Sequence, residues 1–183
     1  MILLLAAGVA AVACARWTRP IADADAALAA GRWDEALASY ARAEARLDRL
    51  PAVRQLLARD YARSARARLW IYYHLQRYDE LIEEAQRAPE AAAPHFWAGL
   101  ALFAKGRAER QPDQQIGWLS RAEDELRRAV EAAPADWDTK YDYELVSRLA
   151  IALRKQPKVP PHQLMQLLRA QPRAAAKPGR HVG

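Results

Sequence analysis

The chain lacks most of the residues that disulfide frameworks, metal sites and β-sheets require. Its 183 residues include one cysteine and four histidines, which excludes a disulfide framework and a cysteine-rich zinc module. Asparagine is absent, serine and threonine together supply six residues, and glycine supplies seven. Alanine, the strongest helix former, supplies 42 residues. Length and composition therefore predict a single all-α domain.

Motifs of common active sites are also missing. The sequence contains no glycine-rich phosphate loop, no His-Glu-x-x-His pair and no paired cysteines. Adjacent acids such as Asp34 and Glu35 point to different faces of a helix, so they do not form a general acid–base pair. His74 and His95 each lack a second ligand one helical turn away. We expect a protein that is not an enzyme and holds no cofactor or metal.

Positive charge is concentrated at the C-terminus. The net charge is +6, but residues 154–183 contain seven basic side chains and no acid, so the rest of the chain is almost neutral. We therefore do not expect nucleic acid to bind the folded part. Docking of residues 154–183 on an anionic membrane or on nucleic acid is the alternative function, with a steep salt dependence as its signature.

The N-terminal segment Ile2–Ala15 carries no charge. As a helix it would span roughly 21 Å, which is short of the ~30 Å hydrocarbon core of a bilayer. Four interpretations remain open: cleavage after Ala13-Cys14-Ala15, lipidation at Cys14, an uncleaved anchor extended by Trp17 at the membrane interface, or a buried first helix. The position of Arg16 and Arg19 after the apolar run opposes export, but an apolar start before a polar helical domain favours it. We expect residues 1–19 to be a signal or anchor segment.

Amphipathic patterns separated by proline and glycine predict the remaining elements. The predicted helices cover residues 21–30, 33–49, 52–76, 78–88, 94–107, 120–133 and 136–154. Ser120 followed by Glu123 indicates a capping box at the start of the sixth helix, which leaves Ala108–Leu119 as an inserted loop. Residues 20–154 form the helical domain. Residues 155–183 form a basic Pro/Ala/Arg tail with a short helix at 162–171.

Similar residues recur at the same offsets in successive helix pairs. Gly31-Arg32-Trp33-Asp34-Glu35-Ala36-Leu37 resembles the junction between the two helices of a tetratricopeptide repeat, and Gln76-Arg77-Tyr78-Asp79-Glu80-Leu81-Ile82 resembles the same junction with Gln in place of Gly. A third copy begins at residues 95–103 and resumes at Ala122. Small residues such as Gly99 suit close helix crossings. The resemblance implies a tetratricopeptide-like stack of about three antiparallel helix pairs, capped by the helix at 136–154; an irregular helical bundle is the alternative.

The first helix of each pair lines the inner surface of a tetratricopeptide stack. By this resemblance the candidate partner-binding residues are Arg63, Arg66, Trp70, Tyr73, Phe96, Leu100, Phe103 and Tyr141. Aromatic anchors flanked by arginine suit a peptide with acidic and apolar side chains. Packing of Trp70, Tyr73 and Phe103 against a neighbouring pair or against the 108–119 loop is the alternative interpretation.

One segment resembles a particular family. Residues 127–145 contain Pro134-Ala135-Asp136-Trp137-Asp138-Thr139-Lys140-Tyr141, which is similar to the Pro-x-x-Trp-Asp-Ala-Lys-Tyr end of MxaK-type and BatC-like proteins. Those families are encoded beside MoxR-type ATPases and von Willebrand-type A-domain proteins. The resemblance implies a periplasmic adaptor on the inner membrane, anchored through residues 2–15. Its implied role is to assist the assembly or maturation of methanol dehydrogenase during methanol oxidation, with those proteins or dehydrogenase subunits as partners.

Overall fold

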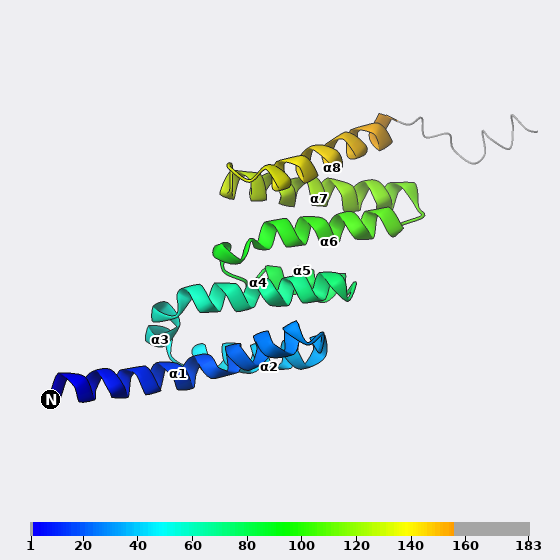
Figure 1. Ribbon diagram of the computed structural model, residues 1–183. Coiled ribbons are helices and arrows are strands. Elements are labelled where there is room, and N and C mark those ends of the chain that lie inside the picture. The colour runs from blue at the N-terminus through cyan, green and yellow to red at the C-terminus, as the bar shows by residue number, and fades with distance from the viewer. Residues whose placement is uncertain (1, 156–183) are drawn as a thin grey trace, which may run out of the picture.

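The chain forms a stack of helices laid side by side in sequence order (Figure 1). The computed structural model describes residues 2–155, with side chains described from Ala15 onward. Within this range all regular structure is helical and no strand is present, so the all-α prediction is confirmed. The predicted tail at 155–183, apart from Lys155, and its short helix at 162–171 lie outside the described residues.

Three helix pairs and one capping helix make up the stack. The elements are α1 (Ile2–Ala29), α2 (Trp33–Leu47), α3 (Pro51–Leu56), α4 (Ala58–His74), α5 (Tyr78–Ala85), η1 (Glu90–Ala92), α6 (Pro94–Ala108), α7 (Pro112–Ala132) and α8 (Trp137–Lys155). Helix α1 packs on α2, α4 on α5 and α6 on α7, while α8 lies against α7. This arrangement is the expected stack, with α3 and the single turn η1 as additional connectors.

The first two pairs turn in the same way. Gly31 follows α1 with a φ of +73°, and Gln76 follows α4 with a φ of +57°. The next residue donates its N–H to the carbonyl five residues back in both turns, from Arg32 to Ala27 and from Arg77 to Tyr72, at 2.9 Å each. These are the hydrogen bonds of a left-handed helix C-cap. The recurrence seen in the sequence is therefore also a recurrence of backbone geometry.

Small residues lie where paired helices approach each other closely. Ala36, Ala122 and Ala129 are buried, as their positions in the repeats predict. Gly99 of α6 faces α7 so closely that a Cβ atom there would lie 2.6 Å from Cγ of Leu126. The fully buried Leu126 fills this space, which explains how α6 and α7 form the most extensive contact in the stack.

The first helix begins much earlier than the sequence predicts. We expected a helix at 21–30, but α1 runs without a break from Ile2 through Pro20 to Ala29. Pro20 removes one backbone hydrogen bond, yet burial of Ile21, Ala24 and Ala27 against α2 holds the helix together beyond it. Trp17 packs against a cluster around Leu47, so its ring is turned toward the folded domain. No helix among residues 2–155 combines the length and apolar character needed to cross a membrane.

The predicted helix at 52–76 is two helices. Helix α3 ends at Leu56, and α4 starts at Ala58 after Leu57, whose ψ of +25° departs from helical geometry. Leu57 is buried beside Leu47 and Tyr61, so packing of this side chain redirects the chain. The predicted helix at 78–88 is also too long, because α5 ends at Ala85 before Pro89.

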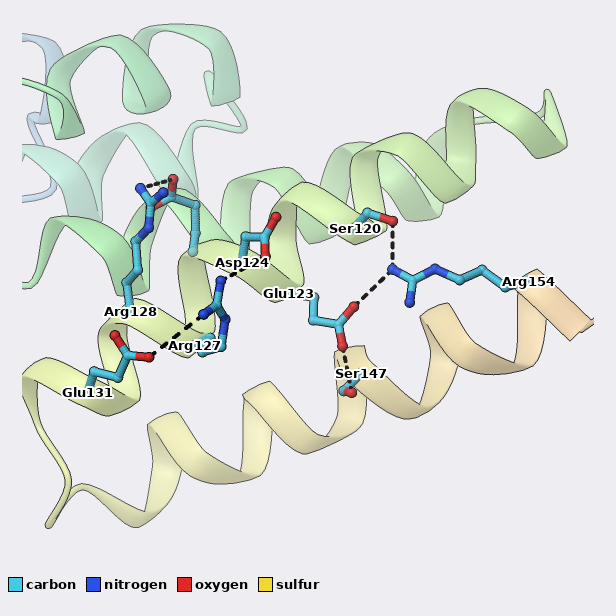
Figure 2. Close-up of polar contacts among 9 residues, drawn as sticks. Ser120, Glu123, Asp124, Arg127, Arg128, Glu131, Ser147 and Arg154 are labelled. Atoms are coloured by element: carbon cyan, nitrogen blue, oxygen red, sulfur yellow. Dashed lines mark hydrogen bonds and ion pairs between the residues drawn. The ribbon is translucent and has the colours of Figure 1, made fainter.

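The predicted loop at Ala108–Leu119 is wrong, and so is the capping box at Ser120. Helix α7 starts at Pro112, which occupies the first turn where a missing N–H costs nothing. Ser120 and Glu123 instead tie α7 to α8 (Figure 2). Arg154 donates to the Ser120 hydroxyl at 2.8 Å and to Oε2 of Glu123 at 3.0 Å, and Ser147 donates to Oε1 of Glu123 at 2.7 Å. The polar pattern therefore marks a contact between helices and not a helix start.

A buried ion cluster joins the first two pairs. The guanidinium group of Arg68 on α4 contacts the carboxylates of Glu44 on α2 and Glu84 on α5. The side chains of Arg68 and Glu84 are 10% and 9% exposed. Tyr61 donates a further hydrogen bond to Glu44 at 3.0 Å. Three helices thus depend on one arginine for charge balance inside the stack.

Candidate functional site

The first helices of the later pairs share one surface, which we call the first-helix face. Helix α4 contacts α6, and the ring of Tyr73 on α4 lies 5.9 Å from that of Trp97 on α6. Burial raises the pKa of the Tyr73 hydroxyl, Tyr78 and Asp142 raise this pKa further, and Arg107 lowers it. This is the surface on which the sequence analysis places the candidate partner-binding residues.

A row of aromatic rings runs along α4 and on to α6. Its contacts, given as ring centroid distances, are Trp33–Trp70 at 5.8 Å, Trp70–His74 at 3.8 Å, Tyr73–Trp97 at 5.9 Å and Phe96–Trp97 at 5.3 Å. Trp70 and Tyr73 are half-buried, and each also packs on a hydrophobic cluster of the stack. Both rings therefore join neighbouring pairs and leave only part of their surface open.

The two predicted arginines of α4 differ in their partners. Arg63 is exposed but already paired, because its Nη1 lies 2.5 Å from Oδ2 of Asp25 on α1. That pairing is also the largest cause of the raised pKa of Arg63. Arg66 donates from Nη2 to the carbonyl of Ala91 at 3.0 Å and has no carboxylate partner among the described residues. Arg66 is therefore the arginine of this pair that is free to bind an incoming carboxylate.

Arg66 borders a cavity of about 300 Å³. The cavity lies between η1, the start of α6, the end of α7 and the start of α8, and its remaining lining residues are Glu90, Ala91, Ala93, Pro94, His95, Phe96, Trp97, Ala129, Ala132, Ala133, Asp136 and Thr139. Most of these side chains are apolar. The structure thus brings Arg66 and Phe96, two of the eight candidate residues, to one pocket.

The other candidates lie elsewhere on the stack. Phe103 is half-buried against the cluster around Leu102 and Val146, with the Arg107 guanidinium 5.8 Å from its ring centre. Leu100 is half-buried on α6. Tyr141 of α8 is 69% exposed and lies near the exposed end of the stack with Trp137. These side chains do not line the pocket.

Acidic side chains also line the pocket. Asp136 caps α8: its carboxylate accepts hydrogen bonds from the Thr139 hydroxyl at 2.8 Å and the Asp138 N–H at 3.1 Å. These bonds, first of all the one from Thr139, lower the pKa of Asp136. His95 lies between two carboxylates, 2.7 Å from Glu125 and 3.6 Å from Glu90. Across the side chains that the structure describes, no three potential metal ligands come together.

The pocket itself was not visible in the sequence. Ala91 and Ala93 line it, and Ala93 has a φ of +55° where the chain turns from η1 into α6. Pro89 and Pro94 bracket this turn and were the available signal, but they indicate only that the chain breaks between helices. Helices α7 and α8 reach the pocket only because the helices stack, and no local sequence pattern marks their lining residues.

Comparison with known proteins gives no relative. No family model matches the chain, and no curated protein is similar to it in sequence. The functional inference therefore depends on the pocket, on the first-helix face and on the resemblance carried by residues 127–145.

Proposed function

We propose that the chain is an adaptor without enzymatic activity that binds a segment of a partner protein on its first-helix face. The observation that carries this proposal is the pocket at Arg66. Arg66, which has no carboxylate partner within the part of the chain that the structure describes, stands at the edge of a mostly apolar cavity of about 300 Å³. This combination of a guanidinium group and an apolar cavity suits a peptide in which an apolar side chain enters the cavity and a neighbouring carboxylate binds the guanidinium.

The charges around the pocket give the peptide an orientation. Glu90 and Asp136 line the pocket and repel a carboxylate, so we expect the acidic residue of the partner to bind Arg66 and not the interior of the pocket. The half-buried rings of Phe96, Trp97 and Tyr73 continue from the pocket along the face and supply contact area. An extended or helical segment with apolar residues after its acid matches this order.

The resemblance to MxaK-type proteins supplies the partner class. In this proposal the adaptor faces the periplasm, is held at the inner membrane by residues 2–15, and assists methanol dehydrogenase maturation. Its partners are then von Willebrand-type A-domain proteins, a MoxR-type ATPase system or dehydrogenase subunits.

The test compares two arginines on the same face of α4. The full chain, tagged at its C-terminus, is purified from membranes of its native host grown with and without methanol, and its partners are identified by mass spectrometry. Arg66→Ala should lose the partner, whereas Arg59→Ala, two helical turns away and also exposed, should retain it. Equal loss in both variants would contradict the pocket, and recovery of ribosomal proteins or nucleic acid in place of an envelope protein would contradict the adaptor.

A further inference from the structure

A second cavity lies between α1 and α2, at the outer end of the stack. It has a volume of about 280 Å³ and is lined by Arg16, Arg19, Pro20, Asp23, Ser39, Arg42 and Arg46. Four arginines thus meet one carboxylate. We call this cavity the arginine cleft.

The two helices build the cleft from matching ridges. Arg16, Arg19 and Asp23 follow one another at helical spacing along α1, and Ser39, Arg42 and Arg46 do so along α2. Because α1 and α2 are antiparallel neighbours, Arg16 comes opposite the end of α2 that carries Arg46. Residues more than twenty positions apart in the sequence therefore form one surface.

Half of the arginines among the described residues pair with a carboxylate, but the cleft arginines do not. Arg32, Arg77, Arg127 and Arg148, for example, each pair with an acid on the same helix face. Among the described residues, none of the four cleft arginines forms an ion pair with a carboxylate. Residues 1–14 and 156–183 contain no Asp or Glu that could supply one. Even counting Asp23, the cleft has an excess of three positive charges.

Part of the cleft is already oriented for an anion. Arg42 is held by two hydrogen bonds, from Nη2 to the Ser39 hydroxyl at 2.9 Å and from Nε to the Ala38 carbonyl at 3.2 Å. A fixed guanidinium loses less side-chain entropy when it binds an oxyanion. Arginine forks match phosphate oxygens in geometry as well as in charge.

The position of the cleft indicates the source of the phosphate. Arg16 follows directly on the apolar segment Ile2–Ala15, and α1 continues through both without a break. At about 1.5 Å per residue, Arg16 and Arg19 lie within roughly 6 Å of the end of that segment along the helix axis. The headgroup layer on each side of a bilayer is about 5–7 Å thick. Trp17 packs inward, which leaves the Arg16–Arg19 ridge uncovered.

We propose that the arginine cleft binds the phosphate headgroup of an anionic phospholipid when residues 2–15 enter the bilayer. This inference rests on the membrane tether in the proposed function and is independent of the peptide pocket. The lipid phosphate would then fix how the stack is oriented against the membrane surface. Apolar insertion supplies the attachment, and the cleft supplies selectivity for negative headgroups.

The test measures lipid binding to the full chain in neutral detergent micelles. Native mass spectrometry follows the retention of phosphatidylglycerol or phosphatidylcholine during titration with each lipid. We expect one phosphatidylglycerol to bind at least tenfold more tightly than phosphatidylcholine. The variant Arg42→Gln/Arg46→Gln should lose roughly tenfold or more of that affinity. The control Arg59→Gln/Arg110→Gln removes the same charge from exposed arginines outside the cleft and should change it less than about threefold.

Each outcome supports or overturns the assignment. Equal losses of phosphatidylglycerol affinity in both double variants would show attraction to the net charge of the whole chain, and they would overturn the cleft as the binding site. Displacement of the lipid by an equal concentration of inorganic phosphate would show that the cleft binds free phosphate, and it would overturn the assignment to a phospholipid headgroup. Incorporation of the parent chain into phosphatidylcholine nanodiscs tests the membrane tether separately. A chain that does not incorporate contradicts the tether in the proposed function, whatever the lipid titration shows for the cleft.

Discussion

Removing Arg68 should destabilise the stack more than removing any exposed arginine. In Arg68→Ala the carboxylates of Glu44 and Glu84 lose their shared cation and face each other in a largely buried site. Breaking a buried ion pair by removing one partner costs about 3–5 kcal/mol. Glu84 is 9% exposed and feels the full effect, while Glu44 is 23% exposed and is partly relieved by water. Against a typical domain stability of about 5–15 kcal/mol, this is a loss of roughly a fifth or more.

The measurement is urea unfolding of the full chain followed by circular dichroism in a neutral detergent. The single variant should show a lower midpoint at an unchanged slope. A triple variant, Arg68→Met with Glu44→Gln and Glu84→Gln, removes all three charges together. It should recover most of the loss, because replacing an entire buried ion cluster is close to neutral.

A matched exposed pair provides the control. Arg148 and Glu144 also form an ion pair, but their side chains are 77% and 61% exposed. Arg148→Ala should cost less than about 0.5 kcal/mol. If Arg68→Ala cost less than about 1 kcal/mol, or if the triple variant were no more stable than the single one, the cluster would be solvated and the reasoning refuted.

Three further predictions follow from backbone and charge. Gly99→Ala should destabilise the chain by about 1–2 kcal/mol, because overpacking against Leu126 outweighs the gain in helix propensity. Gly117→Ala on α7 should stabilise the chain by about 0.5–1 kcal/mol, because a Cβ atom there would have no other atom within 4 Å. Thermal unfolding compares the two variants. Gln76→Gly should raise stability by about 1 kcal/mol in the same assay, since glycine accepts the φ of +57° without strain, and a loss would contradict the repeated turn. Burial, with the charges of Asp138 and Asp136, raises the pKa of Asp142 above 3.8. The contribution of this carboxyl group to the free energy of unfolding is therefore complete below pH 3.8 and is lost as the pH rises. Asp142→Asn should therefore be more stable than the parent at pH 7, and the difference should disappear near pH 3; a constant difference would refute the assignment.

Local patterns predicted the helix pairs well. All seven expected helices end within about three residues of the end of an observed helix, because apolar period and proline breaks act locally. The start of the sixth expected helix is the instructive error, because it lies eight residues after the observed start at Pro112. Ser120 and Glu123 carry the spacing of a capping box, but their partners are Ser147 and Arg154 on another helix. A local motif and a tertiary contact can use the same residues.

The candidate site was predicted less completely. Helical spacing places Arg63 and Arg66 on one face of α4, but it cannot show that Asp25 on α1 already binds Arg63. Arg68 was not singled out, although it stands in register with the buried Ala65 and Leu69, and a charge among core positions is itself a signal of a buried partner. Such pairings join residues that are distant in sequence, so they appear only when the helices are stacked.

Helix α1 connects the two surfaces for which functions are proposed. Asp25 lies nine residues after Arg16, which places it on the opposite side of the helix. There it accepts hydrogen bonds from Tyr40 and Arg63 at 2.5 Å each and fixes α1 to α2 and α4. The arginine cleft thus points away from the stack while the same helix supports the start of the first-helix face. Packing of α1 on the domain is described from Trp17 onward, so cleavage after Ala15 would leave the pocket intact. Under the proposed function, retention and cleavage of the N-terminal segment therefore differ in whether the chain stays at the membrane, and not in whether the pocket forms.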